Sequence, residues 1–287
     1  MNKKVIVFSI AGSDSSGGAG IQADVKTISA LGGYAAAALT AVTVQNTLGV
    51  QDVHYMPAAL VGRQMAAVIE DLQPDAVKIG MTGSLEIIDE IARVLHLYSL
   101  RQIVFDPVMA STGGRRLMAD EAVEAICTKL FPEVTLVTPN LHEAEILLQQ
   151  PVRTIDDMKQ AACLLYETYR CAFLIKGGHL AGNDMCDVLH DGKEVHLLYG
   201  RRIDSENLHG TGCTLSSAIA TYLAQGLSLY EAVARAKEYV SQAIEAGKDL
   251  HIGQGNGPLW HFPQSINQHF SQSTNQHFPQ SANQIER

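Results

Sequence analysis

Residues 5–33 read VIVFSIAGSDSSGGAGIQADVKTISALGG, which predicts a strand, a glycine-rich loop and a helix in immediate succession. The first six residues are apolar on both faces, as a buried parallel strand requires. The helix is indicated by four apolar residues that recur on one face: Ile21, Val25, Ile28 and Leu31. Gly32-Gly33 then ends it. This order of elements is typical of an α/β fold.

The same alternation continues along most of the chain. Further short, branched apolar runs predict strands, and two amphipathic runs predict helices: strands at 76–79, 103–105, 134–137 and 172–175, helices at 85–97 and 155–169. Repeated strand–helix–strand units predict a mostly parallel central sheet covered by helices on both faces. Asp191-Gly192 lies between two further apolar runs, 186–190 and 195–199, and this pattern predicts an antiparallel hairpin.

Composition excludes several classes of function. The 287 residues are 46% hydrophobic and 18% charged, which is ordinary for a globular protein with a substantial core. The formal net charge is −9 and no basic block occurs, so we expect no nucleic-acid partner. No apolar run approaches the roughly 18 residues of a membrane span. Five cysteines without a Cys-x-x-Cys pair argue against disulfides and structural zinc, which favours a reduced, cytoplasmic protein.

The glycine-rich loop at residues 11–20 lies between the first strand and the first helix. In open α/β sheets, ligands bind at the carboxyl ends of the strands, and a helix N-terminus attracts anions. The loop has neither the Gly-Lys-Ser/Thr of a Walker A motif nor a regular Gly-x-Gly-x-x-Gly. From these residues alone, a ligand site and a tight connection are equally good interpretations.

A second glycine-rich segment, Gly210-Thr211-Gly212-Cys213, leads into an apolar helical pattern. Backbone N–H groups at such a helix start could stabilise the charge of a transferring phosphoryl group. Cys213 falls in the first turn, where we expect the thiol pKa to be lowered. The alternative is a plain helix start with an inert buried cysteine.

Polar residues also follow two other predicted strands. Asp106 comes directly after the strand at 103–105, where it could face a metal-bound phosphate or cap the following loop. Asn140 and Glu143 follow the strand at 134–137 with the spacing of a helix capping box. The same two residues could instead hold a hydrated magnesium ion, which takes few protein ligands.

Seven segments in order resemble the hydroxymethylpyrimidine kinase/phosphomethylpyrimidine kinase family of the ribokinase superfamily. The resemblance runs from about residue 5 to 257 and rests on these stretches: residues 11–24, 45–47, 78–81, 106–108, 138–140, 176–179 and 209–213. It implies a ribokinase-like fold, a homodimer, and an ATP- and Mg²⁺-dependent enzyme of thiamine biosynthesis. Such enzymes phosphorylate 4-amino-5-hydroxymethyl-2-methylpyrimidine and then its monophosphate.

The resemblance also implies roles for individual residues. Gly12, Asp24, Gln45, Met81 and Val108 are expected to line the pyrimidine pocket. The remaining roles are the nucleotide contacts, the magnesium contacts and the anion hole: Asn140, Thr211 and Lys176 for the nucleotide, Asp106 and Glu143 for Mg²⁺, and Gly210 and Gly212 for the anion hole. Cys213 stands where sugar kinases of the superfamily carry an aspartate base, so it is a candidate base for the attacking hydroxyl.

Three competing functions stay open at this point. A pyridoxine or pyridoxal kinase would share the fold and phosphate machinery, and Gln45 is the residue that best argues against it. A non-catalytic nucleotide sensor would lack the anion hole or the magnesium residues. A dehydrogenase would need a dinucleotide fingerprint that the loop at residues 11–20 does not supply.

The end of the chain differs in composition from the rest. Three consecutive copies of an octapeptide rich in Gln, Asn and Ser occupy residues 262–285. Such segments bury too little apolar surface to offset the entropy of ordering. We therefore divide the chain into a kinase domain at residues 1–261 and a disordered low-complexity tail at residues 262–287.

We predict that truncation after Phe262 leaves activity intact, because the repeats contribute nothing to the folded core. Phosphorylation of the pyrimidine alcohol by the full and truncated chains at equal concentration checks this. A truncated protein that keeps its circular dichroism spectrum but loses turnover would contradict the division.

Overall fold

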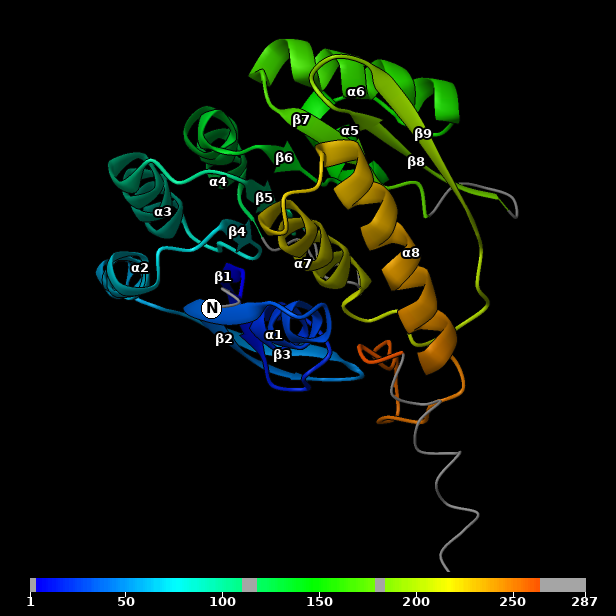
Figure 1. Ribbon diagram of the computed structural model, residues 1–287, viewed down its shortest axis with the longest axis horizontal. Helices are drawn as coiled ribbons and strands as arrows, with labels where there is room; N and C mark the ends of the chain where they lie inside the picture. Colours follow the sequence, from blue (N-terminus) through cyan, green and yellow to red (C-terminus); the bar gives the residue numbers. More distant parts are fainter. Residues whose placement is uncertain (1–3, 110–117, 179–183, 264–287) are drawn as a thin grey trace, which may run out of the picture.

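The computed structural model describes residues 4–109, 118–178 and 184–263 (Figure 1). Within them the chain forms one nine-stranded sheet in the order β3-β2-β1-β4-β5-β6-β7-β8-β9. Neighbours from β2 to β7 pair in parallel, whereas β3, β8 and β9 add antiparallel edges. The strands are β1 (Ile6–Asp14), β2 (Tyr34–Asn46), β3 (Gly49–Tyr55), β4 (Ala76–Ile79), β5 (Ile103–Phe105), β6 (Leu136–Val137), β7 (Ala172–Ile175), β8 (Asp184–His190) and β9 (Val195–Arg201).

Helices cover both faces of this sheet (Figure 1). They are α1 (Gly20–Ala30), α2 (Ala58–Leu72), α3 (Leu85–Tyr98), α4 (Asp120–Ala125), α5 (Leu141–Leu148), α6 (Ile155–Tyr169), α7 (Thr211–Ala224) and α8 (Leu229–Gly247). One hydrophobic cluster joins the sheet to α2, α3, α4 and α6, and a second joins it to α1, α7 and α8. Among the described helices, none combines the length and apolar character of a membrane span.

The predicted fold is confirmed, and several bounds agree with the sequence patterns. β4, β5, β7 and α6 have the predicted limits, and the hairpin forms as β8 and β9. β1 is longer than predicted: after a bulge, Ser13 and Asp14 still pair with β2, so the start of the glycine loop belongs to the sheet. β6 is shorter than predicted and comprises only Leu136–Val137, although the backbone of Thr135 still bonds to Ile103 and Ala172 on either side. His179 and the tail from residue 264 lie outside the described residues.

The antiparallel pair β2–β3 at one edge was not predicted. β2 begins Tyr34-Ala-Ala-Ala-Ala, a run with little strand propensity of its own. Its pairing with β1 on one side and β3 on the other overrides that local preference. The consequence for the site is direct, because β2 carries Gln45 near its carboxyl end.

An ion pair between Lys78 of β4 and Asp24 of α1 lies in the interior. Both side chains are fully buried, and Lys78 Nζ lies 2.9 Å and 2.8 Å from the two carboxylate oxygens. Ser9 of β1 and Ser217 of α7 donate hydroxyl hydrogen bonds to the same carboxylate. Burial alone would lower the pKa of Lys78, but Asp24 raises it well above its ordinary value. Four elements therefore meet at one charged pair.

We predict that Lys78→Met lowers the free energy of unfolding by about 3–5 kcal/mol, because it leaves a buried carboxylate without its counter-charge. A matched control is Lys129→Met, whose partner Asp89 is about as exposed as the lysine itself, and which should cost less than about 1 kcal/mol. Urea unfolding curves measure both losses. Equal losses for the two variants would contradict the structural role of the buried pair.

Candidate active site

The predicted site segments converge at the carboxyl edge of the parallel strands. The carbonyl oxygen of Gly18, in the loop after β1, packs against Gly210. Asn140 after β6 forms a bridge with Lys176 after β7. Gly212 at the start of α7 lies against the side chains of Asp106 and Lys176. The structure thus brings together residues that are far apart in sequence at the place where open α/β sheets bind ligands.

The start of α7 has the geometry of an anion hole. Gly210 caps the helix with φ of +84°, and a Cβ there would overlap the Gly18 carbonyl oxygen, so only glycine fits. No side chain caps the helix. A Cβ on Gly212 would lie 3.3 Å from Asp106 Oδ2 and 3.4 Å from Lys176 Nζ. The first turn of α7 therefore opens onto a carboxylate and an ammonium group. The Thr211 hydroxyl donates locally to the Leu208 carbonyl oxygen (2.6 Å).

Lys176 and Asp106 form the charged pair of this site. Lys176 Nζ lies 2.8 Å from Asp106 Oδ1, and the Thr138 hydroxyl is 3.3 Å from the same oxygen. Burial alone would lower the pKa of Lys176, but Asp106 and then Glu143 raise it, so the amine stays protonated. The Lys176 side chain keeps 16% of its surface exposed, compared with none for Lys78. It is therefore the charge that a ligand can reach.

Asn140 and Glu143 form the capping box of α5. Asn140 Oδ1 accepts from the Glu143 N–H (2.9 Å), and Glu143 Oε2 accepts from the Asn140 N–H (2.8 Å). Glu143 Oε1 also accepts from the N–H of Met109 (3.1 Å). Burial raises the pKa of Glu143. The capping interpretation is confirmed, and the carboxylate links α5 to the loop after β5. Within the described ranges, no cluster of three or more His, Cys, Asp or Glu side chains suggests a metal centre.

The expected activation of Cys213 is contradicted. Burial raises the pKa of its thiol to about 11, and the carboxylates of Asp24 and Asp106 act in the same direction. Lys78 and the N–H of Gly20 favour the thiolate but offset only part of this rise. The helix start therefore does not outweigh desolvation, and the group is a thiol at neutral pH in the ligand-free protein.

Val108 has a backbone conformation that was not predicted from the sequence. Its φ of +43° is unusual for a β-branched residue and marks local strain. The strain lies between Pro107 and Met109, whose N–H is held by Glu143. Strained residues of this kind cluster at binding and catalytic sites. Val108 lies two residues after Asp106, whose carboxylate faces Gly212.

The remaining residues expected in the pyrimidine pocket divide into two groups. Gly12 packs against Met81, since a Cβ on Gly12 would lie 3.3 Å from Met81 Sδ. Gln45 lies next to His209, with 3.3 Å between its side-chain amide and the imidazole Nε2. Asp24 is fully buried, and both of its carboxylate oxygens are bonded to other side chains. We therefore assign Asp24 to the support of the site.

Asp14, at the end of β1, organises the glycine loop and was not singled out from sequence. Its carboxylate accepts from the N–H groups of Ser16 (2.8 Å), Gly18 (3.1 Å) and Ala19 (2.8 Å) and from His209 (2.8 Å). Burial alone would raise the pKa of Asp14, but these hydrogen bonds hold it far below the ordinary value. The only sequence signal was its position in the Gly-Ser-Asp-Ser-Ser run.

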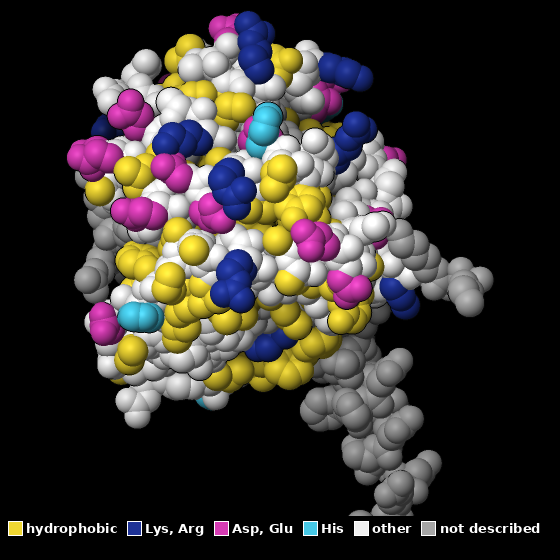
Figure 2. Space-filling view, turned by 90° about the vertical axis from the view of Figure 1, so that its left-hand side faces the viewer, with side chains coloured by type: hydrophobic (Ala, Val, Ile, Leu, Met, Phe, Trp, Pro, Cys, Tyr) yellow, Lys and Arg dark blue, Asp and Glu magenta, His cyan; other side chains and the backbone are white. Residues whose placement is uncertain are grey.

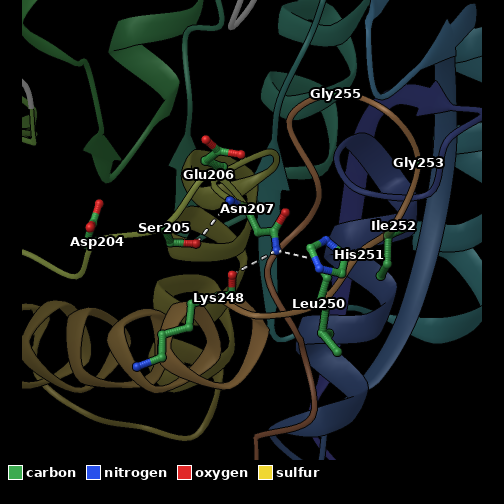
Figure 3. Close-up of a pocket in the computed structure, with 10 residues that line it drawn as sticks. All are labelled: Asp204, Ser205, Glu206, Asn207, Lys248, Leu250, His251, Ile252, Gly253 and Gly255. Atoms are coloured by element: carbon green, nitrogen blue, oxygen red, sulfur yellow. Dashed lines mark hydrogen bonds between the residues drawn. The ribbon is translucent and has the colours of Figure 1, made fainter.

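A cavity of about 300 Å³ lies on the other side of the segment that precedes Gly210 (Figure 3). Its walls come from residues 204–207 on one side and from Lys248, residues 250–253 and Gly255 on the other. None of the predicted site residues lines it. The Asn207 side chain points between the two walls and donates to the carbonyl oxygens of Gly247 and Leu250 (2.7 Å each). The Asn207 hydrogen bonds hold the end of α8 against the segment that leads to His209. The cavity shares no lining residue with the site described above.

The chain matches known proteins over most of its length. Residues 14–260 fit the family model described as phosphomethylpyrimidine kinase. A hydroxymethylpyrimidine/phosphomethylpyrimidine kinase of Rhizobium meliloti is 48% identical over 90% of this chain and 97% of its own length. A thiamine biosynthesis bifunctional protein of Geobacter sulfurreducens is also 48% identical, over 89% of this chain, which spans about half (52%) of that longer protein.

Solved structures agree with this comparison. The phosphomethylpyrimidine kinase of Clostridium difficile 630 is 42% identical, with a TM-score of 0.75 over 84% of this chain and 100% of that one. A pyridoxal kinase of Bacillus subtilis in complex with ADP has a TM-score of 0.85 at 34% identity, over 92% of this chain and 100% of that one. The fold is thus shared with both kinds of vitamin kinase, whereas the family model and the more identical relatives point to one of them. The chain belongs to the phosphomethylpyrimidine kinase family.

Proposed function

We propose that the chain transfers the γ-phosphoryl group of ATP to the hydroxymethyl group of 4-amino-5-hydroxymethyl-2-methylpyrimidine, and then a second phosphoryl group to the monophosphate. The observation that carries the proposal is the uncapped start of α7 facing the Lys176–Asp106 pair. Positioning and charge stabilisation supply most of the catalysis of phosphoryl transfer. This arrangement provides both at one point.

Each residue of the arrangement has a distinct part in the proposal. Lys176 meets the phosphates as a point charge, exchanging its bond to Asp106 for bonds to phosphoryl oxygens. Gly210 and Gly212 place no side chain over the start of α7, so that backbone N–H groups there are proposed to receive the oxygens of the transferring group. The Thr211 N–H already donates to the Leu208 carbonyl oxygen (3.2 Å), which leaves this part to Gly212 and Cys213. Asn140, which pairs with Lys176, and Thr211, which lies between the two glycines, are proposed to contact the nucleotide.

Magnesium fits the donor chemistry at this place. Carboxylate oxygens are the ligands that Mg²⁺ prefers, and it usually keeps several waters. Both Glu143 oxygens already accept backbone hydrogen bonds, so Glu143 is suited to hold a metal-bound water. Asp106 Oδ2, which faces Gly212, is suited to direct contact. When bound, the ion would neutralise charge on the ATP phosphates.

The pyrimidine is proposed to lie near Gly12, Met81 and Val108, with Gln45 reading its polar edge. Gly12 and Met81 are in contact in the structure. A pyridoxal kinase is the closest alternative, because solved pyridoxal kinases share the fold at 34–35% identity. Gln45 favours the pyrimidine, since a side-chain amide offers a donor and an acceptor together. A nucleotide sensor is disfavoured because the anion hole and its charged pair are intact.

The decisive experiment offers Mg-ATP with each alcohol and weighs the products. We expect mono- and diphosphate from the aminopyrimidine alcohol and no diphosphate from pyridoxine or pyridoxal. A monophosphate from the pyridine alcohols alone would overturn the proposal.

A homodimer, a cytoplasmic location and the absence of nucleic-acid partners stay predictions. On the face seen in Figure 2, Lys and Arg side chains are interspersed with Asp and Glu.

We predict that Cys213→Ala slows the first phosphorylation by about tenfold or more, and slows the second less. The first acceptor is a hydroxyl that must lose a proton, whereas the second is a phosphate with a pKa near 6 that is already ionised at pH 7. Because the thiol pKa is about 11, the thiolate fraction rises about tenfold per pH unit between pH 7 and 9.

The wild-type rate of the first step should therefore rise over this pH range, and the rate of the second should stay nearly flat. Single-turnover rates of the two steps, measured separately at each pH, check the prediction. A Cys213→Ala variant that keeps the rise, or loses both steps equally, would show that the thiol is not the base.

A further inference from the structure

The contact between His209 and Gln45 has no part in the transfer chemistry described above. His209 is 9% exposed, and its Nε2 lies 2.8 Å from Asp14 Oδ2. The same nitrogen lies 3.3 Å from the terminal nitrogen of Gln45 as that amide is placed. The other terminal atom of Gln45 lies 3.1 Å from Thr43 Oγ1. The side chains of His209 and Thr43 thus contact the residue proposed to read the substrate, and Asp14 contacts it through His209.

Asp14 determines which atom of His209 carries a proton. Besides His209, the carboxylate accepts from the N–H groups and hydroxyl of the glycine loop, and these bonds keep it ionised. An ionised carboxylate can only accept. The Nε2 atom, 2.8 Å away, must therefore be the donor, whether the imidazole is neutral or charged.

The proton on His209 then determines how the Gln45 amide is turned. The single Nε2 hydrogen points mainly at Asp14 (2.8 Å) and can reach Gln45 (3.3 Å) only as the longer branch of a three-centre hydrogen bond. An N–H group can share its hydrogen only with an acceptor, so the amide atom that faces His209 Nε2 must be the oxygen. Thr43 fits the same orientation. Its hydroxyl oxygen lies 3.1 Å from both the Ser13 carbonyl oxygen and the terminal atom of Gln45, and its one hydrogen can serve only one of them. With the Gln45 NH₂ group turned toward Thr43, the hydroxyl donates to Ser13 and accepts from Gln45. With this orientation no donor faces another donor, and His209 and Thr43 each meet Gln45 with a complementary atom.

An amide held in this way presents a fixed pattern to a ligand. One N–H is bonded to Thr43 and one lone pair of the oxygen is bonded to His209, which leaves one donor and one acceptor side by side. A 4-aminopyrimidine has the complementary pair, because its amino group donates and the adjacent ring nitrogen accepts. A ring without that amino group can form only one of the two bonds.

We propose that His209, anchored by Asp14, is a positioning residue that holds the Gln45 amide in the orientation that selects a 4-aminopyrimidine edge. The inference rests on the proposed function and deepens it, since it states how the pocket distinguishes this ring. His209 acts through Gln45 and takes no part in phosphoryl transfer. Thr43 fixes the other end of the amide.

The test compares two alcohols: the aminopyrimidine substrate and the same molecule with hydrogen in place of the 4-amino group. The wild-type protein should prefer the amino compound in kcat/KM by about tenfold or more, as expected for one well-placed hydrogen bond to a buried partner. His209→Leu should reduce this preference to within about threefold, mainly through KM for the amino compound. KM for ATP should stay the same.

His209→Gln provides the rescue, because its terminal NH₂ can donate both to Asp14 and to the Gln45 oxygen. We expect it to restore most of the preference. Thr43→Val is an independent second variant: it keeps the shape but removes the acceptor for the Gln45 NH₂ group, and it should also reduce the preference. The matched control is Thr40→Val on the same strand, whose hydroxyl donates to the Met81 carbonyl oxygen. It should affect both alcohols alike.

Each outcome bears on one of the two proposals. A folded His209→Leu protein that keeps the wild-type preference would overturn the inference, as would a wild-type protein with no preference. If His209→Leu does not fold, the same ratio measured in Thr43→Val decides. A wild-type protein that phosphorylates neither pyrimidine would overturn the proposed function and this inference with it.

Discussion

The buried pair of Lys78 and Asp24 is the constraint on which the arrangement of the site depends. Two charges without solvent exposure are tolerated only when the geometry is good and the remaining lone pairs are satisfied. Here Ser9 and Ser217 complete the carboxylate, so β1, α1, β4 and α7 are fixed relative to one another. Cys213 and the glycines of the anion hole lie on the first turn of α7. Their position at the sheet edge follows from this pair.

The glycine loops meet a second constraint, which is steric. Gly210 and Gly18 come so close that a side chain on the former would overlap the carbonyl oxygen of the latter. Asp14 holds the Gly18 side of this contact through the loop N–H groups, and it also binds His209, the residue before Gly210. One carboxylate therefore joins the first glycine loop to the second. The proposed anion hole and the proposed substrate pocket therefore share one support.

Local patterns sufficed for the elements whose sequence agrees with their environment. β4, β5 and β7 are short runs buried on both faces, and α6 has a clear apolar face, so their limits were predictable. The limits of β2 were not predictable, because its alanine run forms a strand only through pairing with β1 and β3. The box of Asn140 and Glu143 was predictable from spacing alone, since both residues act within one turn.

The parts of the site that escaped prediction depend on partners distant in sequence. His209 and Asp14 are 195 positions apart, and nothing local connects them. The high thiol pKa of Cys213 comes from burial and from carboxylates on other elements, whereas the sequence showed only a helix start. The resemblance to a kinase family supplied the residues of the site. It could not show which of these residues only support the site and which have side chains that a ligand can reach.

The two lysines at the site show how the structure makes that distinction. Lys78 is fully buried, bonded to both oxygens of a carboxylate that is itself completed by two hydroxyls. Removing it from Asp24 would leave a buried charge, so no ligand can compete for it. Lys176 is bonded to one oxygen of Asp106 and is partly exposed. In the proposed function, an arriving phosphate takes this ammonium group, and Asp106 is then able to accept a metal ion. The same residue type, on β4 in one case and directly after β7 in the other, thus serves as a fixed support and as a proposed exchangeable contact.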